Sequence, residues 1–282
     1  MVREFYLMNE KNEKYSLMDI ENYCLLTDPS GLGYEYDTEY EKLGNLFVES
    51  IRTLTQGRIG GTANFKSYEN FRDFVNFVEA AKKLKISYKI PIENELVEYF
   101  RDVKMKSLSK TQKLPNGCIS ESVLVDCLSL WYQDEKTIYD INEQDIIWDF
   151  YWDPYFADYD VRSVVVNNDG HVDAPFQIEI PDYLKNPVIE ILVDGKVINR
   201  LALEIEIQNG QKFQYSSKEG EIYLRVQNSN GTYTSLFTND YVDINNENIF
   251  QLPQGNEVEI RMSAENNIMD GTVNVFKRYK VV

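Results

Sequence analysis

The residues whose types could support chemistry are few, and their spacing suits turns better than sites. The stretch NNDGHVD, residues 167–173, comes nearest to a calcium loop, because Asn167 and Asp169 precede Gly170 at ligand positions. Val165 stands where another oxygen ligand is needed, and no glutamate closes the loop. The stretch therefore predicts a turn between strands, and we expect no bound metal.

Nucleophiles and acid–base groups are also poorly placed for catalysis. His171 is the single histidine, and the three cysteines show neither metal-ligand spacing nor a neighbouring base (Cys24, Cys118, Cys127). The glycines of GRIGG, residues 57–61, lack the strand-to-helix context and the lysine of a phosphate-binding loop. We expect no enzymatic activity, no catalytic residue and no cofactor.

An aromatic stretch, WDFYWDPYFADYDV at 148–161, holds seven aromatic residues and four aspartates but no basic residue. Aromatic rings beside carboxylates are typical of a sugar-binding platform, and they equally suit a packed joint between two domains. We interpret the stretch as the joint, since the sequence pattern changes there and proline stiffens the chain. The joint residues are Trp148, Tyr151, Trp152, Pro154 and Tyr155.

Length and charge limit the classes of function. A chain of 282 residues exceeds one average domain, so two hydrophobic cores are expected. The net charge of −17 argues against an electrostatic grip on DNA or an anionic membrane, although it leaves room for DNA to pass nearby. We find no apolar run of signal-peptide or membrane-span length, and free thiols indicate synthesis in the cytoplasm.

The first half reads as strands with one helix. Two short strands flank the polar turn 9–14, and a helix is predicted over about 68–84, with Ser67 as its N-cap and lysines at its end. Residues 28–45 are acidic, rich in turn residues and expected to form a loop. The glycines at 57 and 60–61 are expected to interrupt the next strand. Further strands are predicted at 86–92, 98–110 and 121–132.

The second half reads almost purely as strands, which predicts a β-sandwich. Asp194–Gly195 is a strong hairpin signal. LALEIEI, residues 201–207, reads as one strand with alternate side chains inward, and EIYLRVQ at 221–227 should point Ile222 inward with Leu224 and Val226. We expect domains at 1–147 and 161–282, joined by residues 148–160.

The order of these segments resembles one family, the distal tail proteins of siphophages that infect Gram-positive bacteria. The likeness covers most of the chain, and it rests on order and spacing, since no single piece is diagnostic. The matching pieces are GRIGGTANF, SYENFRDFVNFVEAAKKL, ISYKIP, EYFRDVKMKSLSK, QKLPNG, ESVLVDCLSLWY, WDFYWDPY and APFQIEIPDYLKNPVIEIL.

The resemblance implies a mainly β protein with two domains. The first would be a β-sandwich-like domain with one helix, related to the tail-tube fold, and the second a galectin-like β-sandwich. Six copies would form a ring in the virion, assembled in the bacterial host cytoplasm, whose channel lets DNA pass. The ring would join the tail-tube protein to a tail-tip or tail-associated lysin-like protein, with tape-measure and receptor-binding proteins as further partners.

The sequence also leaves alternatives to this structural role open. A carbohydrate-binding adhesin would use the aromatic stretch as its platform, and a tail-tube protein with an extra domain would be a nearer relative. The length leaves no room for the inserted carbohydrate-binding modules of larger relatives, and no tryptophan follows Trp152 to build a galectin-type sugar site. The ring contacts are expected around 28–45 and 98–118, with Tyr34, Tyr36, Tyr40, Arg101 and Lys104 as candidates.

Overall fold

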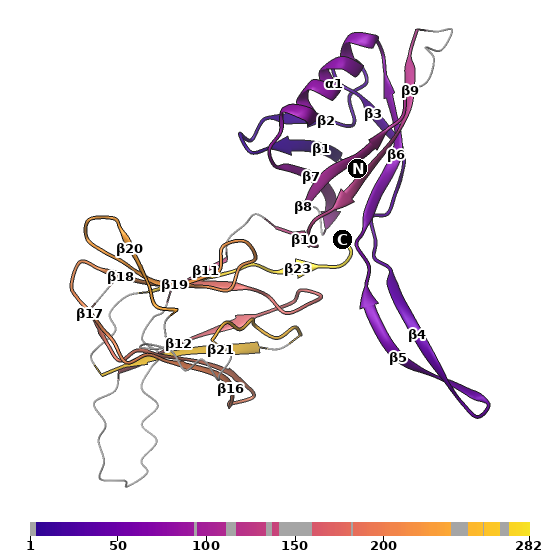
Figure 1. Cartoon of the computed structure of the whole chain (residues 1–282). Helices are drawn as coiled ribbons and strands as arrows, with labels where there is room; N and C mark the ends of the chain where they lie inside the picture. The colour runs from indigo at the N-terminus through magenta and orange to yellow at the C-terminus, as the bar shows by residue number, and fades with distance from the viewer. Residues whose placement is uncertain are drawn as a thin grey trace. The chain divides into compact units, whose positions relative to one another are not determined.

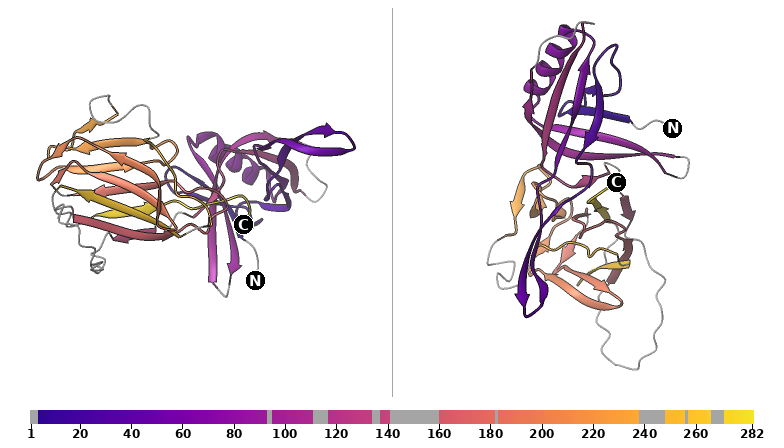
Figure 2. Two further views of the ribbon diagram at one scale, coloured as in Figure 1. Left: turned by 90° about the horizontal axis from the view of Figure 1, so that it is seen from below. Right: turned by 90° about the vertical axis from the view of Figure 1, so that its right-hand side faces the viewer.

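The fold was obtained as a computed structural model, which divides the chain into two compact units. One unit comprises Met1–Asp134 with Tyr279–Val282, and the other comprises Glu135–Arg278 (Figures 1 and 2). The sequence-based division ended the first domain at residue 147 and did not return the C-terminus to it. The structure describes residues 4–92, 95–110, 117–133, 137–140, 160–181, 183–237, 248–255, 257–265 and 271–282.

A nine-stranded sheet forms the frame of the first unit, and the neighbouring strands along its main order pair antiparallel. The main order is β2-β1-β7-β8-β9-β6-β3, and β10 pairs with β8 and with β23. The two N-terminal strands and the long strand at 98–110 are confirmed. The strands are β1 (Glu4–Asn9), β2 (Lys14–Ser16), β3 (Leu25–Ser30), β6 (Arg58–Phe65), β7 (Leu84–Ile92), β8 (Glu95–Leu108), β9 (Ile119–Cys127), β10 (Trp131–Tyr132) and β23 (Arg278–Tyr279).

Helix α1 (Tyr68–Ala80) lies across one face of this sheet (Figure 1). The Ser67 hydroxyl accepts a hydrogen bond from the Asn70 amide, which confirms the predicted cap, and the helix buries Phe71 and Phe74 in the core. The helix ends four residues before its predicted end, at Ala80. The amides of residues 82 and 83 donate to the Glu10 carboxylate instead of continuing the helix, so the lysines follow the last turn.

The segment 28–45, expected as a loop, is mostly strand. After β3 the chain forms β4 (Tyr36–Leu43), which pairs with β5 (Leu46–Leu54) as a separate two-stranded sheet. The prediction was wrong because nearly every residue of this hairpin is exposed, so apolar and polar residues do not alternate. The glycines at 60–61 do not interrupt β6. A Cβ on Gly61 would lie 2.9 Å from the Thr27 carbonyl oxygen, so glycine permits the close approach of β3.

The second unit is a sandwich of two main sheets, as predicted. One sheet has the order β11-β22-β13-β18-β19-β20 and the other β12-β21-β15-β16, and their inward side chains share one hydrophobic core. A short pair, β14 with β17, accompanies them. The strands are β11 (Thr137–Asp140), β12 (Asp160–Asn167), β13 (Phe176–Ile180), β14 (Leu184–Lys185), β15 (Val188–Val193), β16 (Lys196–Ala202), β17 (Glu206–Ile207), β18 (Lys212–Ser216), β19 (Tyr223–Gln227), β20 (Tyr233–Ser235), β21 (Glu257–Ala264) and β22 (Thr272–Val275).

Two turns predicted from the sequence are present in the second unit. Asp194 and Gly195 adopt φ values of 51° and 72° and join β15 to β16, which confirms the hairpin. The predicted turn at 167–173 is also confirmed, because the Gly170 amide donates to the Asn168 side-chain oxygen at 3.1 Å. Asn168 is itself buried, and its amide group donates to the Leu252 carbonyl at 3.0 Å.

Two strand predictions in the second unit were wrong. LALEIEI is not one strand, because β16 ends at Ala202 and the ladder partner changes from β15 to β14 before β17. Leu203 lies between the two and is nevertheless buried, as its position in the pattern predicts. Ile222 precedes β19 and is 55% exposed, so the inward alternation begins only at Leu224.

Candidate assembly surface

The β4–β5 hairpin, here called the arm, projects from the sheet of the first unit (Figure 1). Its strands pair with each other and with no other strand of the described chain. Apolar side chains gather at its tip, where Leu46 and Phe47 are each 70% exposed beside Leu43 and Val48. A lone two-stranded hairpin is marginally stable in water, so an exposed apolar tip indicates a surface that another molecule covers.

The arm is also charged. It carries four acidic and two basic residues over 36–54, a net charge of −2. At its base the Arg52 guanidinium lies 4.0 Å from the centre of the Tyr36 ring, and the Lys280 ammonium lies 5.5 Å from it on the returning C-terminal segment. These cation–π contacts hold the Tyr36 ring in place at the base of the arm, whereas the apolar side chains at its tip remain exposed.

Backbone and side-chain hydrogen bonds fix the root of the arm to the sheet. The Thr55 amide donates to the Glu35 carbonyl at 2.9 Å, which closes the base of the hairpin. The Gln56 side chain donates to the Cys127 carbonyl at 3.1 Å, and the Cys127 amide donates to the Gly57 carbonyl at 2.9 Å. The arm therefore leaves the sheet in a direction set by the end of β9.

Arg101 lies beneath this root and not on the surface, so it is corrected as a contact candidate. The side chain is 3% exposed, and Nε donates to the Ser129 carbonyl at 2.8 Å. A Cβ at Gly57 would lie 2.5 Å from Nη2, so the guanidinium fills the space that glycine leaves. Burial lowers the pKa of Arg101, and its Nη1 has no hydrogen-bond partner among the described residues. Arg101 thus supports the arm from within.

A basic row runs across the sheet beside the arm root. Lys104 of β8 and Arg58 of β6 both lie opposite Asp126 of β9 in the strand registers. Asp126 also accepts the Lys106 ammonium at 3.4 Å and the Arg58 guanidinium at 3.2 Å. One carboxylate therefore faces three cations, and Lys104 is exposed. The row presents excess positive charge on a chain that is acidic overall.

The remaining sequence-based candidates fall in two groups. Tyr34 and Tyr40 are 51% and 60% exposed, whereas Tyr36 is half-buried at the arm base. The five joint residues lie outside the described part of the chain. Sequence reasoning missed the apolar tip, although Gly44–Asn45 between two strand-like runs is a hairpin signal, and Gly44 indeed adopts a φ of +64°.

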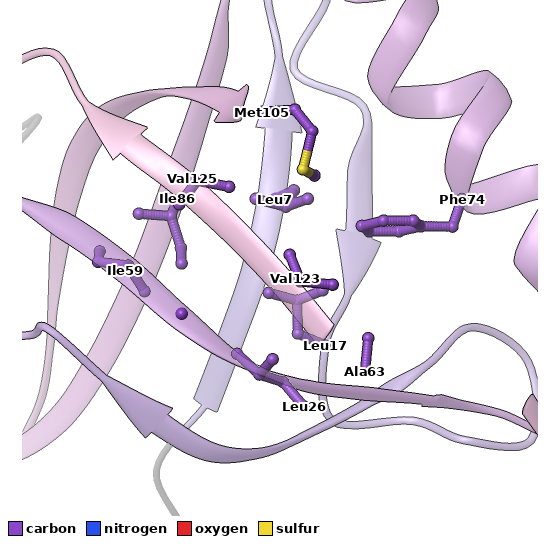
Figure 3. A pocket seen from close by; sticks show the side chains of 11 residues that line it. Leu7, Leu17, Leu26, Ile59, Ala63, Phe74, Ile86, Met105, Val123 and Val125 are labelled. Carbon is purple, nitrogen blue, oxygen red and sulfur yellow. The ribbon is translucent and has the colours of Figure 1, made fainter. Parts of the chain in front are cut away.

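The first unit also encloses a small apolar cavity of about 20 Å³ (Figure 3). Side chains from the sheet and from the helix point into it, among them Leu7, Ile59, Phe74, Ile86 and Val125. A cavity of this size with apolar walls offers no polar partner to a ligand and is a packing defect.

Groups with catalytic potential are buried or scattered. Burial raises the pKa of Cys24 to about 12 and also raises the pKa of Cys127, so neither is a thiolate at neutral pH. Within the described ranges, no cluster of three or more histidine, cysteine or acidic side chains is arranged to hold a metal ion. Across those same ranges, no helix has the length and apolar character to cross a membrane.

Comparison with known proteins connects this architecture to phage tails. The family described as distal tail protein, N-terminal domain, matches residues 4–128. Distal tail proteins of Lactococcus phages SK1 and p2 are each 25% identical, over 149 and 119 residues. These alignments cover 50% and 40% of the chain but only 49% and 39% of the relatives, so the chain matches half or less of their length.

Solved structures extend the likeness in fold to the whole chain. A chain of the phage P2 baseplate, in its activated conformation with calcium, aligns over 100% of both chains with a TM-score of 0.63 and 17% identity. The Dit protein of phage SPP1, described as a paradigm of the hub adsorption apparatus in phages infecting Gram-positive bacteria, covers 97% of this chain and 98% of its own, with a TM-score of 0.65 and 12% identity. Residues 4–128 therefore match the model of the distal tail protein N-terminal domain, which confirms the resemblance drawn from the sequence.

Proposed function

We propose that the chain is a structural hub at the distal end of a phage tail. Copies of it would form a hexameric ring that joins the tail tube to the tail tip and receptor-binding apparatus. The family match over residues 4–128 and the likeness in fold to baseplate and hub proteins support this role. It is a role in assembly and not in catalysis.

The observation that carries the proposal is the exposed arm. An arm with an apolar tip, fixed at its root, suits a contact in which each copy reaches to the next. Such a head-to-tail contact uses two different surfaces and closes into a ring when the rotation between copies fits. The arm has a net charge of −2 and the basic row around Asp126 has excess positive charge, so the two surfaces are complementary in sign.

Within this contact the exposed candidates have distinct roles. We place Tyr40 with the apolar tip against the neighbouring copy, and Lys104 in the row that receives the arm. Tyr34 and Tyr36 would lie at the base of the arm, where Tyr34 packs edge-on against Tyr36 at 5.5 Å. Reversing the charge of Lys104 should weaken the ring, because the acidic side chains of the arm would then face a glutamate at residue 104.

The ring would enclose a channel through which DNA passes without specific binding. The net charge of −17 supports this, since a neutral or acidic wall holds a polyanion weakly. Tail-tube and tail-tip or lysin-like proteins would bind the two sides of the ring, with tape-measure and receptor-binding proteins as further partners. The site of action would be the virion, after assembly in the host cytoplasm.

The mass of the purified full chain in solution tests this function. Sedimentation velocity and negative-stain imaging should give rings of six, alone or stacked in pairs. Lys104→Glu should shift the distribution toward monomer, whereas Lys196→Glu, at the exposed β15–β16 turn of the second unit, should leave it unchanged. A monomer at every concentration would refute the hub, and long tubes would favour a tube protein instead.

A further inference from the structure

The outer face of the six-stranded sheet in the second unit carries polar side chains from several strands. Burial alternates along β13, β19 and β22, so every second side chain leaves the core. Strand registers align the outward side chains in three rows. The rows are Thr272–Glu179–Gln214–Arg225–Ser235, Asn274–Gln177–Ser216–Tyr223 and Lys212–Gln227–Tyr233. Each member of these rows is polar or a tyrosine, and we call them the polar strip. Gln214 and Ser216 of β18 are buried beneath it, so its exposed part is formed by the other members.

Arg225 lies near the centre of the strip, and two aromatic rings contact its guanidinium group. Its central carbon is 3.9 Å from the centre of the Tyr223 ring and 3.9 Å from that of the Tyr233 ring. Nε donates to the Gln214 side-chain oxygen at 2.8 Å. Two rings and one hydrogen bond thus hold a side chain that on most surfaces moves between rotamers.

The group that holds Arg225 is itself fixed. Gln214 is 8% exposed, and its amide nitrogen donates to the Glu179 carboxylate at 2.8 Å. Glu179 also accepts the Lys212 ammonium at 2.9 Å, so this acid is neutralised by another cation. The charge of Arg225 is therefore not matched by Glu179. Within the described part of the chain, the guanidinium of Arg225 makes one hydrogen bond, from Nε. Its two terminal nitrogens make none there.

A fixed guanidinium with a free edge is a ready receptor for an oxyanion. Two parallel N–H donors match the geometry of a carboxylate or phosphate, and such charge-assisted bonds are stronger than neutral ones. Because the rotamer is already held, binding does not cost the ordering of a long side chain. Glu179, the acid of the strip, is already paired with Lys212, so the charge of Arg225 remains available to an external anion.

The neighbours of Arg225 favour a saccharide over a peptide as the carrier of that oxyanion. Protein interfaces need apolar or aromatic anchors at a desolvated centre. The strip offers hydroxyls and amides instead, including Ser235, Gln227 and Gln177, and its two tyrosines already contact the guanidinium. Groups of this kind donate to and accept from the hydroxyls of a polyol.

We propose that the polar strip binds an acidic glycan or phosphorylated polyol, with Arg225 holding the oxyanion and the neighbouring amides and hydroxyls contacting the polyol hydroxyls. The inference concerns the second unit alone and stands whether or not the chain forms a ring. It assigns to that unit a ligand-binding role in addition to the structural one.

Calorimetric titration of the full chain at low salt tests the proposal. The probes are a neutral glucose oligomer, a galacturonate oligomer, a glycerol-phosphate oligomer and a glutamate peptide of similar length. Binding of the galacturonate or the glycerol-phosphate oligomer, with little binding of the other two, supports the strip and tells carboxylate from phosphate. Equal binding of the glutamate peptide would show a general anion contact and overturn it. Equal or stronger binding of the neutral oligomer would also overturn it, as would no binding of any probe.

Substitutions locate the site. Arg225→Lys keeps the charge but loses the paired donors, so the affinity for the acidic probe should fall about tenfold or more. Arg200→Lys is the matched control, because Arg200 is an exposed arginine of the other sheet, paired with Glu190 at 3.4 Å. Thermal melting of both variants checks folding, and sedimentation checks the ring separately. An unchanged affinity in a folded Arg225→Lys variant would remove Arg225 from the site.

Discussion

Replacing Phe47 at the tip of the arm by serine should separate assembly from folding. The side chain is 70% exposed in the isolated chain, so the substitution should change the free energy of unfolding by less than about 0.5 kcal/mol. Burying a phenylalanine is worth about 1.5–3 kcal/mol. If the neighbouring copy covers the exposed part, each contact should lose about 1–2 kcal/mol, which weakens it roughly 5- to 30-fold.

Sedimentation velocity over a range of concentrations measures the loss, and urea unfolding measures stability on the same samples. Val197→Ser is the control, since Val197 is an exposed apolar residue on a hairpin of the second unit. The ring should assemble only at a higher protein concentration in the Phe47→Ser variant than in the unmodified chain. The control should assemble at the same concentration as the unmodified chain. An unchanged assembly midpoint with Phe47→Ser, or an equal loss with Val197→Ser, would refute the assignment of the arm.

Three further predictions concern the first unit. Gly57→Ala should destabilise it by about 1–3 kcal/mol in urea unfolding, because the added methyl would lie 2.5 Å from a buried guanidinium nitrogen; Gly33→Ala, with open space around it, should cost far less. Tyr279→Ala should cost about 1–2 kcal/mol by the same measurement, since this residue of the C-terminal segment packs on the first core, and no loss would place the segment outside it. Burial raises the pKa of Cys24 to about 12, so a thiol reagent at about pH 8 should modify the half-exposed Cys118 and reach Cys24 only on unfolding. As the pH rises above about 9, the Cys24 thiol ionises in the unfolded chain but not in the folded chain. The free energy of unfolding should therefore fall above about pH 9. Fast modification of Cys24 in the folded chain would contradict its burial.

Local sequence patterns predicted those elements that have one buried and one exposed face. The helix was recognised because its apolar residues recur on one side and Ser67 caps it. The sandwich strands were recognised by their alternation, and Asp194–Gly195 by its turn chemistry. In each case a contact with the core of the same unit imposes the pattern, so one sequence is enough to reveal it.

The arm escaped prediction for the opposite reason. Residues 36–54 bury almost nothing within the described chain, so no core imposes a period on them, and the acidic run in β4 reads as loop. Arg101 was mistaken for a surface group because its burial depends on a glycine far away in sequence, at residue 57. The setting of Arg225 depends likewise on side chains from three strands, which sequence alone does not bring together.

The account rests on the arm reaching from one copy to the next. Electron microscopy of the assembled full chain, at a resolution that traces strands, tests this most directly. We predict six copies in a closed ring, with the tip at Leu46–Phe47 of each arm covered by the adjacent copy near Lys104. A ring in which the arms extend free into solvent, or a chain that stays monomeric, would contradict the account.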